Sequence, residues 1–417
     1  MDDELIESGT LPLDRKSRLP GTGFFYPDSL DEDRAEERAK EAVEGAEAVV
    51  ITDSDADGLG CIALIREAYD AALDPAPFEE RRRAKLDDTD EEGEARSASG
   101  SRTQSDEPSG EEADDEVDER AGSPVALLPS GPHSFEEDLE YVAEFLETDT
   151  DVFVCDICPD AFEYIAEDLR AVVRRAGAVR WFDHHQWDEE LAASVRELGI
   201  DLVVGESDEE CSTDVTLRSL EYDFDERFRE LAAVTRDHDL WLKEDERSDD
   251  LADYAYWTGA EEYAAVVGAY GVDLPEVARE YVDQRRVEKR LLIEKTVDRA
   301  VEHEVGEWSV GVTYGRCSQN EVADALREQG ADAAVIVKPS GSASIRGSDD
   351  FERCHEVAGQ VNGGGHPKAA GCKPDIYDDM LDYAHHWTTE GATTKRVILR
   401  AFESLAQEEA SADTDAK

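Results

Sequence analysis

The sequence is poor in basic residues, and lysine is the scarcest of them. Among 417 residues, 104 are acidic and 43 are basic, the formal net charge is −61, and only 11 of the basic residues are lysine. At ordinary ionic strength this charge would destabilise a compact fold, whereas molar salt shortens the Debye length to about 3 Å and screens most of the repulsion. We therefore expect a halophilic protein from a salt-rich cytosol. Because 40% of the residues are hydrophobic and periodically placed, an acidic disordered chain is excluded.

Long apolar runs, a leader-like N-terminus and dense cysteines are also lacking. No run approaches the roughly 18 apolar residues that a membrane span needs, and the first residues carry neither a basic nor an apolar leader region. The seven cysteines are scattered, unlike those of a disulfide scaffold. These absences argue against a membrane protein and a disulfide-rich secreted domain, and we expect a soluble, cytoplasmic protein.

The apolar pattern predicts an α/β fold. Short apolar runs alternate with amphipathic segments, which indicates a mostly parallel sheet with helices on both faces. Strands are expected at 48–52, 125–128, 152–154, 179–182 and 202–204, and helices at 58–72, 135–147 and 161–175. A long charged helix is expected at 274–305, joining this domain to a smaller α/β domain.

Composition also suggests where the domains begin and end. We expect an N-terminal extension at 1–35, a catalytic domain at 36–273, a substrate-binding domain at 306–408 and a disordered tail at 409–417. A disordered acidic insertion is expected at about 79–122, because the residues from Asp87 to Glu116 include no large apolar side chain. In the second domain, strands are expected at 310–313 and 333–337, and Ser318 and Glu321 form a capping-box pattern that would open a helix between them.

Three short acidic or histidine-containing clusters directly follow predicted strands. They are Asp53-Ser-Asp55-Ala-Asp57-Gly58, Cys155-Asp156 and Asp183-His184-His185, and Asp237 follows later. Ligands of an open parallel sheet bind beyond the carboxyl ends of its strands, so these side chains should meet at one edge. Carboxylates and imidazoles suit Mn²⁺ or Mg²⁺, and their number is sufficient for two ions, an arrangement suited to attack on phosphate esters.

Each cluster taken alone has a plainer interpretation. The first could be half of a calcium loop, although the later Glu of an EF-hand is lacking. Cys155 and Cys158 could belong to a redox or zinc motif, although no partner pair is evident. The adjacent His385 and His386 are explained by a solvent-facing helix. The order of the clusters along the chain therefore carries more weight than any one of them.

A glycine-rich segment predicts an anion-binding site in the second domain. Gly363, Gly364 and Gly365 would expose backbone N–H groups and permit positive φ, as in an anion-binding nest, and His366 would add a side-chain donor. A tight turn is the alternative. Upstream, Arg346 offers a bidentate fork for phosphate, unless it is only a surface residue of an edge strand.

In the order and type of these motifs, the chain resembles the DHH phosphoesterase superfamily. Within it, the similarity is to the RecJ-like branch with a GGGHxxAAG-type DHH-associated domain, and it covers about 48–74 and 125–375. The resemblance implies that Asp55 and Asp57 bind different metal ions and that Asp156 bridges them. It implies that His184 and Asp237 complete the two coordination shells, with Asp239 as the alternative to Asp237.

The resemblance also implies roles for the remaining residues of the third motif. His185 would contact the scissile phosphate, and Asp183 would orient a histidine from outside the coordination shell. Many members of the superfamily carry a metal-binding histidine shortly before the first carboxylates. Here Ile51, Thr52 and Asp53 occupy that stretch, and we expect Asp53 to replace the histidine as a ligand.

The function implied is a metal-dependent phosphodiesterase, specifically an exonuclease of DNA repair that acts on single-stranded DNA or RNA with two Mn²⁺ ions, or with Mg²⁺. Trp187 and Trp241 could stack on bases, although packing in the core is the commoner role. One alternative is a nanoRNase, a pAp phosphatase or a cyclic-dinucleotide phosphodiesterase, because no OB-fold is evident. Another is a replication-fork scaffold that binds replication or repair proteins. Coordination by metals and local arginines would let so acidic a chain bind nucleic acid.

Overall fold

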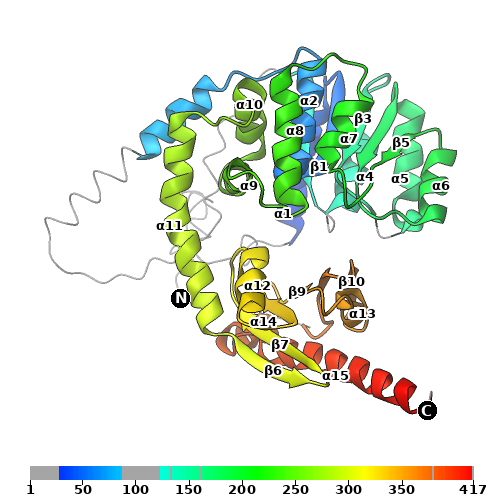
Figure 1. Ribbon diagram of the computed structural model, residues 1–417. Helices are drawn as coiled ribbons and strands as arrows, with labels where there is room; N and C mark the ends of the chain where they lie inside the picture. Colours follow the sequence, from blue (N-terminus) through cyan, green and yellow to red (C-terminus); the bar gives the residue numbers. More distant parts are fainter. Residues whose placement is uncertain (1–27, 87–122, 132–133, 160, 378–379, 416–417) are drawn as a thin grey trace, which may run out of the picture. The chain divides into compact units, whose positions relative to one another are not determined.

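The computed structural model describes residues 28–86, 123–131, 134–159, 161–377 and 380–415, with side chains described between 36 and 407 of these. The chain divides into two units, Met1–Val282 and Asp283–Lys417 (Figure 1). Helix α11, Glu276–Asp298, begins in unit 1 and continues into unit 2.

The centre of unit 1 is a five-stranded parallel sheet. Its strands are β1 (Ala48–Asp53), β2 (Val125–Ser130), β3 (Asp151–Cys155), β4 (Val179–Asp183) and β5 (Asp201–Val204). Their order is β2-β1-β3-β4-β5, and every neighbouring pair is parallel. After β1 the chain forms β2 on one side of β1, and β3 then pairs with the other side of β1. The carboxyl ends of β1 and β3 therefore form the switch point at which such sheets bind ligands.

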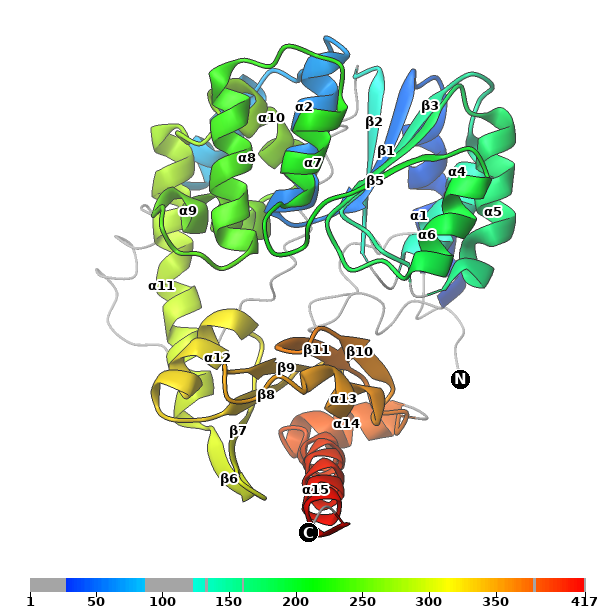
Figure 2. The same cartoon turned by 45° about the vertical axis from the view of Figure 1, so that its right-hand side comes forward.

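Helices cover both faces of this sheet, as expected (Figure 2). The helices of one face are α1 (Asp28–Val43), α4 (Phe135–Phe145), α5 (Phe162–Arg175) and α6 (Glu189–Glu197). The helices of the other face are α2 (Ala56–Ala68), α7 (Ser212–Ser219), α8 (Glu226–Asp239), α9 (Arg247–Trp257) and α10 (Ala260–Tyr270). Alternate residues of β1 enter the two cores, Val49 and Ile51 on the first face and Val50 on the second.

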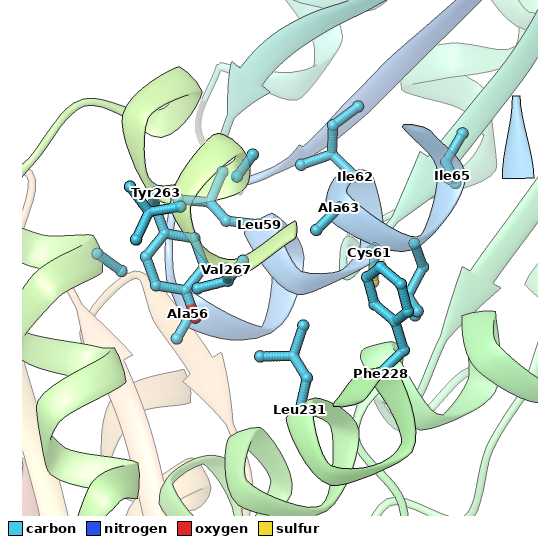
Figure 3. Close-up of a cluster of buried hydrophobic side chains, with 14 of the residues drawn as sticks. Ala56, Leu59, Cys61, Ile62, Ala63, Ile65, Phe228, Leu231, Tyr263 and Val267 are labelled. Carbon is cyan, nitrogen blue, oxygen red and sulfur yellow. The ribbon is translucent and has the colours of Figure 1, made fainter. Parts of the chain in front are cut away.

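Helix α2 is buried on nearly all sides, which explains its continuous apolar sequence. Leu59 and Ile62 pack among Phe228 and Leu231 of α8 and Tyr263 of α10 (Figure 3). A helix enclosed in this way has little freedom to shift. The residues that precede it, at the end of β1, are therefore held rigidly.

Unit 2 contains a six-stranded mixed sheet. Its strands are β6 (Val301–Val305), β7 (Trp308–Tyr314), β8 (Ala333–Val337), β9 (Ala343–Gly347), β10 (Gly363–Gly365) and β11 (Ala369–Cys372). The order is β10-β11-β9-β8-β7-β6, in which only β7 and β8 are parallel. The helices are α12 (Gln319–Glu328), α13 (Cys354–Gly359), α14 (Met380–Thr388) and α15 (Ala392–Asp415). The result is a second, smaller α/β unit, as expected.

Several expected elements differ from the structure. Positions 76–86 are helical, although disorder was expected from 79, because Arg82 is buried and pairs with Glu262 at 2.7 Å. Residues 301–305 form strand β6 and do not continue the long helix, which ends at Asp298. Helix α15 reaches Asp415, so the expected disordered tail is helical as far as it is described.

Two smaller expectations also need correction. Helix α12 starts after Ser318 as expected, but the Ser318 side chain makes no capping hydrogen bond, and Glu321 pairs with Lys289 at 2.5 Å. His386 is buried, not solvent-facing, and its Nε2 lies 2.7 Å from the carbonyl of Lys338.

Positions 1–27 and 87–122, which hold most of the expected extension and insertion, lie outside the described residues. No helix in the described ranges combines the length and apolar character of a membrane span.

Candidate metal centre

The first acidic cluster forms the turn from β1 into α2. Asp55 is the N-cap of α2, and its Oδ1 accepts hydrogen bonds from the amides of Asp57 at 2.9 Å and Gly58 at 3.1 Å. A Cβ atom at Gly58 would lie 2.3 Å from the carbonyl oxygen of Asp53, so only glycine fits this turn. The setting is strand, turn and helix, which differs from the helix-loop-helix of an EF-hand.

Asp57 is buried and held by the first residues of α7. Its Oδ2 accepts a hydrogen bond from the amide of Ser212 at 2.6 Å, and its Oδ1 accepts one from the amide of Thr213 at 2.7 Å. The Thr213 hydroxyl also donates to the Asp57 carbonyl at 2.8 Å. Each carboxylate oxygen has a second lone pair. The Asp57 carboxylate is therefore fixed in orientation and can still bind a cation.

Asp156 and His184 extend from the ends of β3 and β4 into the same space. Asp156 has φ 57, a left-handed conformation that is uncommon for residues other than glycine and frequent at functional sites. His184 Nε2 lies 3.7 Å from Asp156 Oδ1, 3.9 Å from Asp57 Oδ2 and 3.4 Å from Asp239 Oδ2. The structure thus brings together residues from four elements: the turn after β1, the ends of β3 and β4, and α8.

Two overlapping groups of these side chains could each hold a metal ion. One consists of Asp156, His184 and His185, and the other of Asp57, His184 and Asp239, with the ligand atoms of each group within 4.8 Å of one another. The buried Oδ2 of Asp239 has no hydrogen-bond partner among the described residues. Carboxylate and imidazole donors with an unsatisfied oxygen among them fit Mn²⁺ or Mg²⁺.

Asp237 has a different environment. Its Oδ1 accepts a hydrogen bond from the amide of Glu244 at 2.8 Å, and its Oδ2 accepts one from the hydroxyl of Ser248 at 2.7 Å. Residues two positions apart on a helix point to different sides. The structure therefore brings Asp239, the alternative, into the group, whereas Asp237 connects α8 to α9 and the loop before it.

The carboxylates of this site repel one another. Burial, followed by the charges of Asp57 and Asp55, raises the pKa of Asp156 well above its ordinary value, and the pKa of Asp239 is raised by the same causes. Burial and the charge of Asp55 raise the pKa of Asp53, at the half-buried end of β1, to about 6. Buried like charges of this kind require a cation to be stable in the ionised form.

His185 and Asp183 form a tight pair at the edge of the carboxylate cluster. His185 Nδ1 donates to Asp183 Oδ1 at 2.7 Å, and Trp187 Nε1 donates to Asp183 Oδ2 at 2.7 Å. Burial alone would lower the pKa of His185, but the hydrogen bond to Asp183 and its charge raise it to about 9. Burial likewise opposes ionisation of Asp183, yet the hydrogen bond from His185 lowers its pKa. The pair with Asp183 therefore favours the protonated form of His185.

The two tryptophans considered for base stacking are half-buried and make ring contacts. Trp187 meets Trp181 edge to face at 5.2 Å in addition to holding Asp183. Trp241 meets His238 at 5.4 Å, and the ammonium of Lys243 lies 4.1 Å from its ring centroid. Cys155 and Cys158 are both reduced thiols.

In unit 2 the glycine motif forms a strand where an open nest was expected. Gly363–Gly365 is β10, paired antiparallel with β11, and of the three only Gly365 has positive φ, at +132. Glycine is required because the two strands approach closely: a Cβ at Gly363 would lie 2.1 Å from the Gly371 carbonyl oxygen. Gly364 has nothing within 4 Å of its Cβ position among the described residues, so its face of the hairpin is open.

Arg346 lies on β9, next to this hairpin. Its Nε donates to Asn320 Oδ1 at 2.8 Å, and its terminal nitrogen donates to the carbonyls of Ile345 and Ala370 at 3.1 and 3.3 Å. The amide of His366 donates to the Ala369 carbonyl at 2.7 Å, which closes the hairpin. Arg346 is thus held in place by neutral acceptors, and no carboxylate of the described residues forms an ion pair with it.

Some residues of the metal centre were not anticipated from the sequence. Ser212 and Thr213 hold Asp57, the Ser212 hydroxyl also donates to Asp156 Oδ1 at 3.0 Å, and Trp187 holds Asp183. The only local signal was a Ser-Thr pair at the start of a helix after β5, which resembles an ordinary helix N-terminus.

Comparison with known proteins gives distant similarities. No protein-family model and no curated protein matches the chain. Among solved structures, an exonuclease RecJ bound to manganese is 15% identical, with 88% of this chain and 94% of that chain covered and a TM-score of 0.46. A DHH domain from a member of a family of ribosomal proteins is 14% identical, with 88% and 92% covered and a TM-score of 0.49. A pGpG-specific phosphodiesterase from Vibrio cholerae is 12% identical, with 84% and 98% covered and a TM-score of 0.42. At these values similarity alone assigns neither family nor activity.

Proposed function

We propose that the chain is a divalent-metal-dependent phosphodiesterase of the DHH type, with a RecJ-like exonuclease activity on single-stranded DNA or RNA. The observation that carries this proposal is the convergence of Asp57, Asp156 and Asp239 on His184 at the switch point of the sheet. The order of the acidic and histidine motifs along the chain agrees with it.

The proposed ligands follow from the number of donor atoms. One imidazole nitrogen binds one ion, so His184 serves a single ion of a pair. The two ions would be bound by four side chains, those of Asp57, Asp156, His184 and Asp239. The carboxylates of Asp53 and Asp55, which are more exposed, would complete the coordination shells of the ions. When bound, two such ions polarise the phosphate and lower the pKa of a water molecule.

The remaining site residues of unit 1 would orient the metal ligands and donate hydrogen bonds to the substrate. Protonated His185, held by Asp183, would donate a hydrogen bond to a phosphate oxygen through Nε2, because its Nδ1 is engaged. Asp183 is itself fixed by Trp187. Ser212 and Thr213 hold Asp57 so that it need not reorganise on metal binding. In unit 2, Arg346 and the open glycine strand would bind a substrate phosphate.

A nuclease assay on the full chain tests this proposal. Mn²⁺ in about 2 M KCl would be supplied with end-labelled single strands, dinucleotides, pAp and cyclic dinucleotides. We expect strand-shortening activity that EDTA and Asp156→Asn abolish. The matched control is Asp349→Asn, which removes the same charge from a 95% exposed side chain. Turnover of only the shortest substrates would replace the exonuclease with an oligonucleotide phosphodiesterase, and equal activity in Asp156→Asn would refute the metal centre.

A further inference from the structure

Unit 2 holds two half-buried cations without acidic partners, although the chain has 104 acidic residues. Lys338 directly follows β8, and within the described residues no carboxylate lies at ion-pair distance from its ammonium group or from the Arg346 guanidinium. Several other basic residues of unit 2 are paired, as in Lys289 with Glu321 and Lys368 with Asp349. Partly desolvated charges without counter-ions are costly, which favours binding of an external anion.

Strand register places the two cations on one face of the sheet. Ile336 pairs with Ser344 and Ala334 with Arg346, and the amide of Lys338 donates to the Ser342 carbonyl at 2.8 Å. Lys338 therefore projects on the same side as Ser344 and Arg346. The pKa of Lys338 is lowered by burial and then by the charge of Arg346, as expected for cations that face a common space.

The spacing suits two anions better than one. Lys338 is opposite Ser342, four residues along β9 from Arg346, so the backbone positions are about 13 Å apart. Hydrogen bonds hold the Arg346 side chain in place, whereas the Lys338 side chain is long and rotatable. Lys338 can therefore contact the phosphate next to the one on Arg346, whereas contact with the same phosphate would require Lys338 to bend toward Arg346.

Beside the cations the surface is open at two glycines of the hairpin, whereas Ser344, between the two positions on β9, is buried. Gly371 pairs with Ser344 and Gly364 pairs with Gly371, so both glycines lie on the face of the cations. Among the described residues, a Cβ at Gly364 would meet nothing within 4 Å, and one at Gly371 would meet only the Ala343 carbonyl oxygen, at 3.9 Å. Gln319 and Asn320, at the N-terminus of α12, hydrogen-bond to Ser344 and Arg346. The amides of a helix N-terminus also favour anions.

We propose that Lys338 binds the phosphate next to the one bound by Arg346, so that unit 2 holds a single-stranded nucleic acid by at least two consecutive phosphates. This inference rests on the proposed function and narrows it to substrates longer than a mononucleotide. Lys338 then acts in substrate choice, because a mononucleotide cannot reach both cations.

Binding measurements on the full chain test the role of Lys338 without catalysis. The probe is a fluorescein-labelled oligothymidylate of about eight nucleotides, titrated in EDTA for the wild type, Lys338→Gln and Lys338→Arg. Arg400→Gln is the charge-matched control, since Arg400 is 75% exposed and pairs with Glu403. We expect Lys338→Gln to weaken binding about tenfold and to flatten the slope of log K against log salt by about 0.7, as for one lost contact. Lys338→Arg should restore both.

Two further titrations separate the possible results. Thymidine 5′-monophosphate should bind equally to the wild type and Lys338→Gln, and a methylphosphonate at the second linkage of the oligomer should remove the difference between them. If Lys338→Gln lost as much affinity for the mononucleotide as for the oligomer, Lys338 would bind the same phosphate as Arg346, and the inference would be overturned. A loss of oligomer affinity in Lys338→Gln no larger than in Arg400→Gln would also overturn it. Metal-dependent hydrolysis, measured separately, decides the proposed function alone. A binding defect in a chain without hydrolysis would leave Lys338 as a strand-binding residue.

Discussion

Asp237 and Asp239 are two residues apart on the last turn of α8 and have different environments. Asp237 accepts two hydrogen bonds that hold α8 to the segment after it, whereas the buried Oδ2 of Asp239 has no hydrogen-bond partner among the described residues and faces His184. A sequence pattern of alternate acidic residues does not distinguish them, because their roles depend on which side of the helix faces the sheet.

This contrast gives a prediction with an internal control. Asp239→Ala should weaken Mn²⁺ binding by about tenfold or more without destabilising the metal-free protein, because it removes a carboxylate whose pKa is raised by burial and by Asp57. Asp237→Ala should instead lower the free energy of unfolding by about 1–3 kcal/mol and leave Mn²⁺ affinity unchanged. Calorimetric titration and urea unfolding would measure the two effects. The reverse pattern would restore Asp237 as the ligand.

The Asp183–His185 pair predicts a pH dependence in the metal-free protein. Because the pKa of His185 is raised from 6.5 to about 9, the pair stabilises the fold fully below pH 6.5, and this contribution disappears as pH rises through about 9. Asp183→Asn should bring the pKa of His185 back toward 6.5 and remove that part of the pH dependence. NMR titration of the histidine side chains would measure the pKa. A value near 6.5 in the wild type would contradict the pairing.

At the scale of elements, the β10–β11 hairpin depends on glycine at some positions and not at others. Gly363 faces the neighbouring strand at a distance that excludes a side chain, whereas Gly364 faces open space. The sequence indicated an unusual backbone at these residues. It could not indicate a paired strand, because pairing requires the fold to bring Cys372 next to Gly363 and Gly371 next to Gly364.

Two alanine substitutions should therefore behave differently. Gly363→Ala should destabilise unit 2 by several kcal/mol, about the cost of severe overpacking, since its Cβ would overlap the Gly371 carbonyl. Gly364→Ala should leave the thermal midpoint nearly unchanged but reduce oligonucleotide affinity, because it adds a methyl group to the open face. Thermal unfolding and fluorescence anisotropy would measure these effects. Equal destabilisation by both substitutions would argue against the strand pairing.

Helix boundaries illustrate the same dependence on long-range contacts. The segment around Arg82 lies directly before the acidic insertion and is rich in arginine. It is nevertheless ordered, because the guanidinium lies 2.7 Å from Glu262 and 4.4 Å from the ring of Tyr281. Glu262 is 180 residues away, which no local pattern can report.

At the scale of the whole molecule, net charge is the dominant feature. A charge of −61 on a folded chain creates repulsion that low salt does not screen. We expect the midpoint of thermal unfolding to rise steadily between about 0.1 M and about 2 M KCl. The control is an uncharged osmolyte at the same osmolality, which should produce a smaller rise. A midpoint independent of KCl would contradict a halophilic adaptation.

The sequence by itself determined the alternation of strands and helices, the parallel sheet of unit 1 and the edge at which the acidic and histidine clusters meet, because periodicity and residue type are local properties. Tertiary structure alone decided that Asp239 and not Asp237 lies beside His184, that α7 holds Asp57, that the glycine strand is paired, and that Lys338 and Arg346 share a face. Each of these depends on contacts between residues distant in sequence, and their geometry is set by packing and strand register.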